Sequence, residues 1–300
     1  MFGKLANAIE LNYGLKISSI KKKKSTNPVF FVESDKNIFI LKSIVSPEKL
    51  PSILQASIEL EAIHVDSPRP ILTSGRELHF KFMDRYYYLY KHIRGQTISI
   101  KQSAEMLETY GNFLARFHLA VKDIKEGLKV SYNFYDMVLA ELQELKTNFN
   151  DNILIKTEKE ISTLSEKFSK LDLQMIHRDY HYGNVLFEGN SITGVLDLDS
   201  CIIGCNIYDI AYFLAELLVH NKNTDLIKSQ TKFLFGYEKE IKLDEEEKKL
   251  IIVMMLIVHI DFAYWFWENN DIEGVNDSLR NLEILYNILS LGGRNETKNI

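Results

Sequence analysis

A short segment of strand-like pattern and tight turns interrupts an otherwise helical region, and it constrains the fold more than any other part of the chain. It runs from Met175 to Leu198 and contains two apolar runs, Val185–Phe187 and Ile192–Leu196. Two such runs separated by a short turn that contains glycine predict a β-hairpin. Because a hairpin brings its two open ends together, Asn184 and Asp197 are expected to lie side by side.

Asn184 and Asp197 together supply the oxygen atoms that a hard cation prefers. An amide oxygen and a carboxylate brought to one place form a site suited to Mg²⁺. Asp179 lies five residues before Asn184 on the same loop, where its carboxylate could accept a proton from a hydroxyl nucleophile. The spacing of His177, Asp179 and Asn184 is typical of kinase catalytic loops, in which the Asp orients the hydroxyl and the Asn holds a metal. The simpler alternative is a polar turn between strands that happens to be acidic.

Around these residues the sequence resembles the aminoglycoside phosphotransferase and choline kinase family of small-molecule kinases. The resemblance is strongest from Ile176 to Leu214, where Tyr208-Asp209-Ile210-Ala211 also fits the family pattern, and it extends more weakly over nearly the whole chain. The segment Gly111–His118 is similar to the Gly-x-x-Leu-Ala-x-x-His stretch that the family has before its catalytic loop.

The resemblance implies an α+β fold of the protein-kinase type with two lobes, a small antiparallel β-sheet N-lobe and a large, mainly helical C-lobe. It implies that Asp179 is the catalytic base and that Asn184 and Asp197 are ligands of Mg²⁺. It also implies that Asp209 is a buried residue that braces the backbone of the catalytic loop. We place the nucleotide-binding lobe at residues 1–93 and the helical lobe, with the catalytic loop, metal loop and acceptor site, at residues 94–300.

A protein kinase is the neighbouring interpretation, because His177-Arg178-Asp179 is also the triplet of its catalytic loop. Three features argue against it. Position 181 is His, where protein kinases usually have Lys, and Asp197 is followed by Leu-Asp rather than Phe-Gly. No Ala-Pro-Glu segment follows, so the sequence has no ordinary activation segment. We therefore predict phosphoryl transfer to a small molecule rather than to a protein.

The first 100 residues alternate between strand and helix patterns, and the pattern after them is mainly helical. A β-rich part followed by a helical part supports the two-lobe architecture. The predicted N-terminal elements are a short helix over Gly3–Tyr13, a hairpin of Val29–Val32 and Ile38–Ile44, a helix from Pro47 to Ile63, and two strands over Leu78–Met83 and Tyr86–Ile93.

Lys42 ends an apolar strand and is predicted to hold the α- and β-phosphates of a nucleotide. A lysine in an apolar run costs burial energy unless it is paired, so a glutamate of the following helix is expected as its partner. Glu59 and Glu61 are the two candidates, and we expect Glu59 because it shares the helix side of Leu54 and Ile58. A surface lysine at the end of an edge strand is the simpler alternative.

The remaining predicted nucleotide contacts are backbone and loop groups. The backbones of Lys91 and Ile93 are expected to bind the adenine ring of ATP or GTP at the lobe junction. The loop between the first two strands has four consecutive lysines and no glycine, so Ser25, Thr26 and Asn27 would have to bind the phosphates through side chains and N–H groups. The lysine run is more typical of a solvated turn than of a phosphate-binding patch, and a nucleic-acid patch is the least favoured interpretation.

The acceptor side is the least constrained part of the sequence. The stretch Asp261–Glu268 holds both tryptophans and faintly resembles the aromatic stretch with which choline kinases surround a quaternary ammonium, although aromatics at this spacing are more often core residues. We take Asp199, Asp261 and Trp265 as candidate acceptor contacts. A polycationic aminoglycoside would need several carboxylates, to which Asp199, Glu216, Asp261, Glu268 and Asp271 could contribute. The sequence does not select among choline, homoserine, a sugar and an antibiotic.

Composition and charge exclude several other classes. The net charge of −5 argues against a nucleic-acid-binding protein. The longest apolar stretch, Leu250–Trp267, is interrupted by His259 and Asp261, which favours a buried helix over a membrane span. Cys201 and Cys205 are too few for a disulfide scaffold, and the N-terminus lacks the apolar core of a secretory signal. A cytoplasmic monomer or homodimer is therefore expected.

These observations predict a phosphotransferase that moves the γ-phosphoryl group of ATP or GTP to a hydroxyl of an aminoglycoside-, choline- or homoserine-like acceptor. The alternative is a catalytically idle member of the same fold, a binding or spore-coat-type protein, which the missing glycines favour. The complete set of Lys42, Asp179, Asn184 and Asp197 argues against that alternative, because an idle protein has no reason to keep all four.

Overall fold

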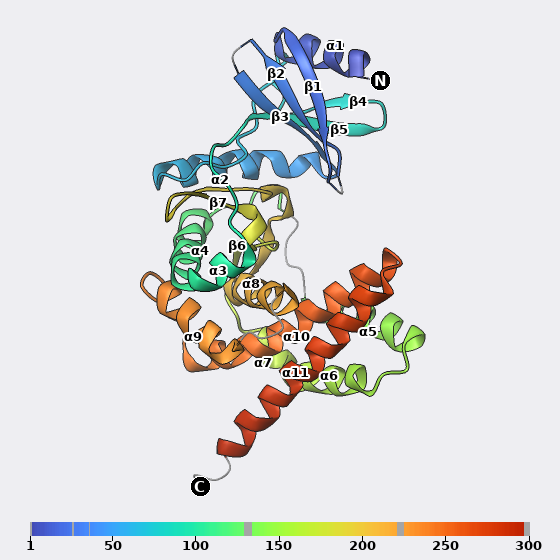
Figure 1. Cartoon of the computed structure of the whole chain (residues 1–300), viewed down its shortest axis with the longest axis vertical. Helices are drawn as coiled ribbons and strands as arrows, with labels where there is room; N and C mark the ends of the chain where they lie inside the picture. The colour runs from blue at the N-terminus through green and yellow to red at the C-terminus, as the bar shows by residue number, and fades with distance from the viewer. Residues whose placement is uncertain (1, 26, 36, 129–133, 221–224, 297–300) are drawn as a thin grey trace. The chain divides into compact units, whose positions relative to one another are not determined.

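The protein is described here by a computed structural model (Figure 1), and its described residues form two compact units. The N-terminal unit comprises the chain as far as Thr97 together with Ala120–Leu128 and Gly183–Cys201, and the C-terminal unit comprises the remainder. The structure describes residues 2–25, 27–35, 37–128, 134–220 and 225–296.

The segment Gly183–Cys201 follows residues of the C-terminal unit in the chain but is part of the N-terminal unit, which affects the predicted site. This segment carries Asn184 and Asp197, which therefore belong to the unit that contains the N-terminal β-sheet, whereas Asp179 belongs to the C-terminal unit. The predicted boundary between functional lobes at residues 93 and 94 stays a prediction.

A five-stranded antiparallel sheet in the order β1-β2-β3-β5-β4 forms the frame of the N-terminal unit. Helix α1 (Phe2–Tyr13) covers one face of this sheet, where Leu5 and Ile9 pack with Leu41 and Leu89. Because side chains alternate along a strand, Lys42 lies on the opposite face from Leu41. The strands are β1 (Ile17–Lys23), β2 (Val29–Ser34), β3 (Asn37–Ile44), β4 (Phe80–Phe82) and β5 (Arg85–Lys91).

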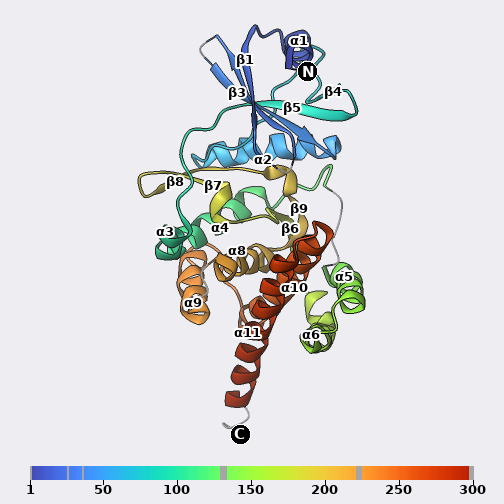
Figure 2. The same cartoon turned by 45° about the vertical axis from the view of Figure 1, so that its right-hand side comes forward.

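The same unit contains helix α2 (Leu50–Ala62), which follows the 3₁₀ turn η1 (Pro47–Lys49), and a separate hairpin (Figure 2). The hairpin consists of β7 (Val185–Glu188) and β8 (Ser191–Val195), with Val185 opposite Val195. At its open end the Leu196 N–H donates a hydrogen bond of 2.8 Å to the Asn184 carbonyl. The predicted hairpin, and with it the approach of the Asn184 and Asp197 loops, is confirmed.

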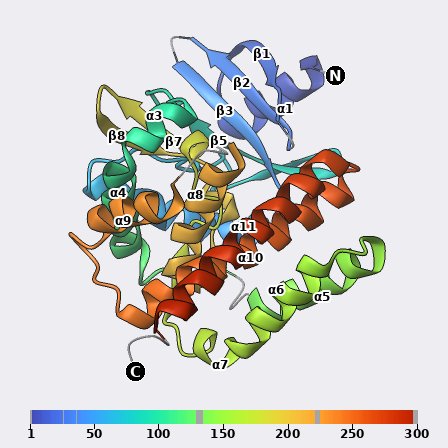
Figure 3. The same cartoon turned by 60° about the horizontal axis from the view of Figure 1, so that its bottom comes forward.

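The C-terminal unit is mainly helical, and α10 is its central element. Helix α10 packs against α5, α8 and α11, and Figure 3 shows α10 and α11 lying side by side. Two short strands, β6 (Leu173–Ile176) and β9 (Ile202–Cys205), pair in this unit. The single turn η2 (Tyr182–Asn184) spans the boundary between the units, and η3 (Leu198–Ser200) belongs to the N-terminal unit. The helices are α3 (Ile100–Glu105), α4 (Leu107–Val121), α5 (Phe134–Asn148), α6 (Asn152–Thr163), α7 (Ser165–Phe168), α8 (Asn206–His220), α9 (Leu226–Tyr237), α10 (Glu245–Glu268) and α11 (Ile272–Glu296).

Glycines set the close packing of α4 on α9. A Cβ atom at Gly111 would overlap the carbonyl of Phe233, and one at Gly236 would overlap the carbonyl of Glu108. At both contacts a backbone carbonyl of one helix lies against a glycine of the other helix, where there is no side chain to keep them apart. The glycine of the predicted Gly-x-x-Leu-Ala-x-x-His stretch serves this contact, and the His of the stretch, His118, lies two turns further along α4.

Among the described residues, α10 is the one helix whose length and composition would suffice to cross a bilayer. Within its most apolar stretch of 18 residues, 67% are buried inside the fold. Such burial is typical of the core helix of a water-soluble protein, which agrees with the predicted buried helix over Leu250–Trp267.

Candidate functional site

Asp209 fixes the backbone of the loop that precedes Asp179. Its carboxylate is fully buried in the first turn of α8 and accepts hydrogen bonds of 2.7 Å from the N–H groups of His177 and Arg178. It also lies 3.0 Å from Nε2 of His118, whose Nδ1 lies 2.8 Å from the Tyr237 hydroxyl. A buried carboxylate with three such partners is well satisfied. The predicted contact of Asp209 with the backbone of this loop is confirmed.

The two backbone hydrogen bonds hold Arg178 in an unusual conformation. Arg178 has a φ of 67°, in the left-handed region that side chains other than glycine rarely adopt. Such strain persists only where neighbouring contacts impose it, and the Asp209 carboxylate supplies those contacts. The resulting bend sets the direction in which the next residue, Asp179, leaves the loop.

Asp179 is held by a tyrosine that the sequence reasoning did not identify. The Tyr212 hydroxyl, on α8, donates a hydrogen bond of 2.7 Å to Asp179 Oδ1, and His181 Nε2 lies 3.7 Å from the same oxygen. Burial, together with the Asp179 charge, raises the pKa of Tyr212 well above its usual range, so this hydroxyl remains a proton donor. The only signal in the sequence was its position one turn after Tyr208 in the Tyr-Asp-Ile-Ala motif.

Lys42 lies between two aspartates in the N-terminal unit. Its Nζ is 2.6 Å from Asp197 Oδ1 and 2.5 Å from Asp199 Oδ1, and the residue is 8% exposed. Burial by itself would lower the pKa of Lys42, but Asp199 and Asp197 outweigh it and raise the pKa above its ordinary value. The alternative of an exposed lysine at an edge strand is wrong, because β3 lies between β2 and β5.

The predicted pairing of Lys42 with a glutamate of α2 is wrong in this structure. Glu59 accepts a hydrogen bond of 2.6 Å from Gln55, and the exposed Glu61 pairs with Arg69 at 2.5 Å. The reason lies in the rotation of the helix. The buried face of α2 carries Ile53, Ala56 and Leu60, whereas Ile58, which guided the prediction, is 40% exposed. Both glutamates therefore flank the exposed side.

Asp199, predicted as an acceptor contact, instead pairs with Lys42; we call Lys42, Asp197 and Asp199 the Lys42 cluster. The Asp199 side chain is 13% exposed. Burial raises the pKa of Asp199 to about 6 against the lowering effect of Lys42, and the neighbouring Asp197 adds to the rise. Lys49, which the sequence reasoning missed, donates hydrogen bonds of 3.1 Å to the carbonyls of Asp199 and Cys201. The turn after Asp197 is thereby tied to the start of α2.

The donor set at the hairpin end fits a hard cation. Asn184 is buried and its loop is bonded to the loop of Asp197, whose backbone is left-handed with a φ of 62°. No group of three His, Cys, Asp or Glu side chains suited to a metal occurs among the described residues. One amide and one carboxylate oxygen suit Mg²⁺, which usually takes few protein ligands and completes its shell with phosphate and water. The residues present therefore fit a cation that arrives with a nucleotide.

The other predicted nucleotide contacts lie apart from one another within the N-terminal unit. Ser25 Oγ donates a hydrogen bond of 2.5 Å to the Asn27 carbonyl in an exposed loop, and Thr26 lies outside the described residues. Lys91 and Ile93 line a cavity that none of the Lys42 cluster reaches. Their predicted contacts with phosphate and adenine stay predictions.

The other two predicted acceptor residues, Asp261 and Trp265, are on α10. Asp261 accepts a hydrogen bond of 3.4 Å from the Tyr208 hydroxyl, and burial raises its pKa against the lowering effect of Arg178. Trp265 is 50% exposed, with its ring centroid 5.2 Å from that of Phe266 in an edge-on contact. The two residues stay predicted acceptor contacts.

Glu141 adds a carboxylate that the sequence reasoning missed, because a single acidic residue on a charged helix carries no local signal. It lies on α5, and its Oε2 is buried without a hydrogen-bond partner in the part of the chain that the structure describes. Burial raises the pKa of Glu141 to about 8; Asp261 and Glu268 add to the rise and Arg178 opposes it. The C-terminal unit thus holds an acidic group contributed by α5 and α10.

Comparison with known proteins agrees with this geometry. The sequence model of the phosphotransferase enzyme family matches residues 20–240. A homoserine kinase from Zymomonas mobilis is 24% identical over 232 residues, which cover 73% of this chain and 71% of the relative. A homoserine kinase from Neisseria meningitidis is also 24% identical, over 71% of this chain and 70% of its own length.

Solved structures of similar fold cover almost the whole chain. An amicoumacin kinase in complex with AMP-PNP and Ca²⁺ has a TM-score of 0.74 at 16% identity and covers 96% of this chain and 92% of its own. A microcompartment-associated aminopropanol kinase has a TM-score of 0.69 at 15% identity, with 95% of each chain covered. These likenesses establish the protein-kinase-like fold. The chain belongs to the phosphotransferase enzyme family and is a small-molecule kinase with a hydroxyl group as acceptor.

Proposed function

We propose that this protein transfers the γ-phosphoryl group of ATP or GTP to a hydroxyl of a small molecule that also carries an amine. The observation that carries the proposal is the fixed position of Asp179. Its loop is held by Asp209 through two backbone hydrogen bonds, and its carboxylate is held by Tyr212. Catalysis of phosphoryl transfer is mostly positioning, so a carboxylate locked in this way suits the residue that orients the acceptor.

In this proposal Asp179 accepts the proton of the attacking hydroxyl as the new bond to phosphorus forms. The β,γ-bridging oxygen leaves with its electron pair as part of the nucleoside diphosphate, so transfer is direct and in line, without a phosphoenzyme. Tyr212 donates a hydrogen bond to Oδ1 of Asp179. The hydrogen bond keeps the carboxylate from rotating away.

The donor is held by residues of the N-terminal unit. Lys42 binds the α- and β-phosphates, and Asn184 and Asp197 hold Mg²⁺, which neutralises charge on the phosphates. Because Lys42 contacts two carboxylates, Asp199 can keep its ammonium in place while Asp197 serves the cation. The backbones of Lys91 and Ile93 bind the adenine or guanine ring, and Ser25 and Asn27 contact the phosphates.

An amine on the acceptor is supported by charge and by the relatives. Asp261 and Glu141 form part of an acidic group in the C-terminal unit, where burial raises the pKa of both carboxyls and the positive charge of Arg178 opposes that rise. Homoserine, aminopropanol and kanamycin, which the names of similar proteins mention, each combine a hydroxyl with an amino group. An ammonium group beside Glu141 would favour loss of the Glu141 proton and would then pair with both carboxylates, and Trp265 could cover it through a cation–π contact.

The test compares Asp179→Asn with a matched control, Asp84→Asn, in the exposed turn between β4 and β5. ADP release is measured with homoserine, aminopropanol and kanamycin as acceptors, and melting temperature is measured with Mg²⁺-ATP and Mg²⁺-GTP. We expect Asp179→Asn to abolish acceptor-dependent turnover while it keeps the rise in melting temperature, and Asp84→Asn to behave as wild type. Turnover by Asp179→Asn comparable to wild type would remove Asp179 from the mechanism. No nucleotide-dependent rise in the wild type would overturn the proposed donor site.

A further inference from the structure

The turn that begins at Asp197 has an unusual backbone. Asp197 has a φ of 62° and a ψ of 38°, in the left-handed region that residues other than glycine seldom adopt. Such a conformation persists only where neighbouring contacts impose it. The backbone also sets the direction in which the Asp197 carboxylate leaves the chain. The contacts that hold this turn therefore decide how the proposed magnesium ligand is aimed.

Hydrogen bonds within the segment Gly183–Cys201 hold the first part of the turn. The Leu196 N–H donates to the Asn184 carbonyl at 2.8 Å, directly before Asp197. The Ser200 N–H donates to the Asp197 carbonyl at 3.1 Å, which closes η3. Because donor and acceptor belong to the same segment, these two bonds do not by themselves fix the turn relative to other elements of the N-terminal unit.

Lys49 holds the last part of the turn from a different element. Its Nζ donates hydrogen bonds of 3.1 Å to the carbonyl oxygens of Asp199 and Cys201, two and four residues after Asp197. An ammonium group has three N–H donors, so one lysine can hold two carbonyls at once. Since both acceptors are main-chain atoms, these bonds fix the course of the backbone rather than the position of one side chain.

The turn η1, which Lys49 ends, is itself held by close packing. The residue before Lys49 is Glu48, and a Cβ atom at Gly127 would overlap the Glu48 carbonyl. Gly127 lies in the segment Ala120–Leu128, which belongs to the N-terminal unit together with η1 and the Asp197 turn. Lys49 therefore extends from an element whose backbone is in tight contact with a second segment.

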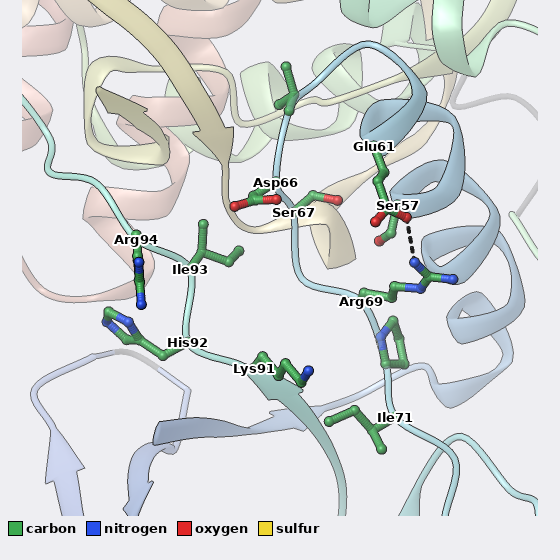
Figure 4. Close-up of a pocket in the computed structure, with 12 residues that line it drawn as sticks. Ser57, Glu61, Asp66, Ser67, Arg69, Ile71, Lys91, His92, Ile93 and Arg94 are labelled. Atoms are coloured by element: carbon green, nitrogen blue, oxygen red, sulfur yellow. Dashed lines mark hydrogen bonds and ion pairs between the residues drawn. The ribbon is translucent and has the colours of Figure 1, made fainter. Parts of the chain in front are cut away.

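The glutamates of α2 are engaged elsewhere. Near the end of the helix, Glu61 pairs with Arg69 at 2.5 Å, beside the cavity drawn in Figure 4. Glu59 accepts a hydrogen bond from a residue of its own helix. Lys49, directly before the start of α2, supplies two hydrogen bonds to the turn of the Lys42 cluster.

We propose that Lys49 is a positioning residue for magnesium binding, an inference that rests on the proposed function. It holds the turn after Asp197 so that the Asp197 carboxylate faces the cation that the nucleotide brings. Groups that orient a metal ligand without touching the metal usually change metal affinity by about tenfold or more when they are removed. Lys42 binds the phosphates in the proposed function, whereas Lys49 acts through the backbone of the turn.

The free Mg²⁺ concentration that gives half-maximal ADP release at saturating nucleotide tests this role. Lys49→Met is compared with Lys4→Met, which makes the same change at an exposed position of α1. We expect Lys49→Met to raise the half-maximal Mg²⁺ concentration about tenfold and Lys4→Met to leave it unchanged. A purely structural role would lower the melting temperature and leave the Mg²⁺ requirement of the folded enzyme as in wild type.

The sign of the effect separates positioning from charge. Removal of a positive charge near a cation site favours the cation, so the loss of charge alone would lower the Mg²⁺ requirement of Lys49→Met. A lowered or unchanged requirement in this variant would therefore overturn the proposal.

A double variant tests whether Lys49 acts through Asp197. The affinity for Mg²⁺-ATP is measured by calorimetry in wild type, Lys49→Met, Asp197→Asn and the double variant. Residues that act as a unit have non-additive effects. We expect Lys49→Met to weaken binding about tenfold in the wild-type background and less than about twofold in the Asp197→Asn background. Equal weakening in both backgrounds would show that Lys49 does not act through Asp197.

Gly127→Ala displaces η1 and leaves the Lys49 side chain in place. Gly14→Ala is the matched control, because both glycines have a positive φ but a methyl group at Gly14 meets open space. We expect Gly127→Ala to raise the Mg²⁺ requirement at least about threefold and Gly14→Ala to leave it unchanged. Equal requirements would overturn the anchoring of Lys49 through η1. A wild type without Mg²⁺-nucleotide binding would overturn the proposed function itself, whereas a failure confined to the variants concerns Lys49 alone.

Discussion

Replacement of Asp199 by Asn tests whether this carboxylate, rather than Glu59 of α2, orients Lys42. Lys42 Nζ lies 2.5 Å from Asp199 and 2.6 Å from Asp197, and the side chains of Lys42 and Asp199 are 10% and 13% exposed. Removing one partner of a buried ion pair usually costs about 3–5 kcal/mol, because the other charge is left unpaired. Here Asp197 still pairs with Lys42, so the cost is closer to that of one charged hydrogen bond, about 1.5–3 kcal/mol.

A second effect reduces this cost. Asp199 and Asp197 repel each other, and the combined influence of burial and that repulsion raises the pKa of Asp199 to about 6 despite Lys42. The Asn variant removes the repulsion along with the attraction. We therefore expect the free energy of unfolding to fall by about 1–2 kcal/mol, and the melting temperature by about 2–5 °C. The lysine loses its second anchor, so we expect the affinity for Mg²⁺-nucleotide to fall about tenfold.

Thermal unfolding and calorimetric titration with Mg²⁺-ATP measure the two effects, and Glu59→Gln is the matched control. Because Glu59 contacts Gln55 rather than Lys42, its replacement is expected to leave nucleotide affinity unchanged. A loss of affinity in Glu59→Gln together with wild-type affinity in Asp199→Asn would refute the reasoning. That result would mean that α2 turns to meet Lys42 when nucleotide binds.

Three further predictions concern the C-terminal unit. Tyr212→Phe removes the hydrogen bond to Asp179, so we expect kcat, measured by ADP release, to fall about tenfold with nucleotide affinity intact; an unchanged kcat would contradict this role. Gly111→Ala forces α4 away from α9, so we expect the free energy of unfolding, measured with urea, to fall by about 2–3 kcal/mol. Gly3→Ala, where the new methyl group meets open space, is expected to leave it unchanged. Equal stabilities of the two variants would disprove the close contact. Glu141 keeps a proton in the folded state that the unfolded chain releases, because its folded pKa is about 8. The free energy of unfolding is therefore expected to decline as pH rises from about 4.5 to about 8, by an amount on the order of 2 kcal/mol, and Glu141→Gln is expected to lack this decline. If the urea midpoints of wild type and Glu141→Gln changed with pH in parallel, the raised pKa of Glu141 would be refuted.

The parts of the site that could be predicted are those that neighbouring residues create. The hairpin follows from two apolar runs joined by a short turn, and chain connectivity then brings Asn184 to the loop of Asp197. The bracing role of Asp209 was available from the family resemblance, because the motif around it marks the start of α8. Each signal lies within a segment of the chain that forms its structure largely by itself.

The partner of Lys42 shows why sequence reasoning stopped short elsewhere. Apolar residues lie on a wide arc of α2, so their pattern did not decide whether Glu59 or Glu61 would face inward. In the structure both glutamates lie outside the buried face of the helix. The true partners are Asp197 and Asp199, more than 150 residues away in the sequence. An ion pair leaves no trace in the local pattern of either partner.

By itself, the sequence determined the class of fold, the hairpin that brings Asn184 to the loop of Asp197 and the loop that carries Asp179. Only the tertiary structure decided that Tyr212 holds Asp179, that Glu141 is a buried carboxylate near Asp261, and that Asp199 belongs to Lys42. The physical reason is the range of the interactions. Hydrophobic periodicity and turn geometry act over a few residues, whereas the pairing of charged and polar groups is set by which elements pack together and how far each helix is rotated.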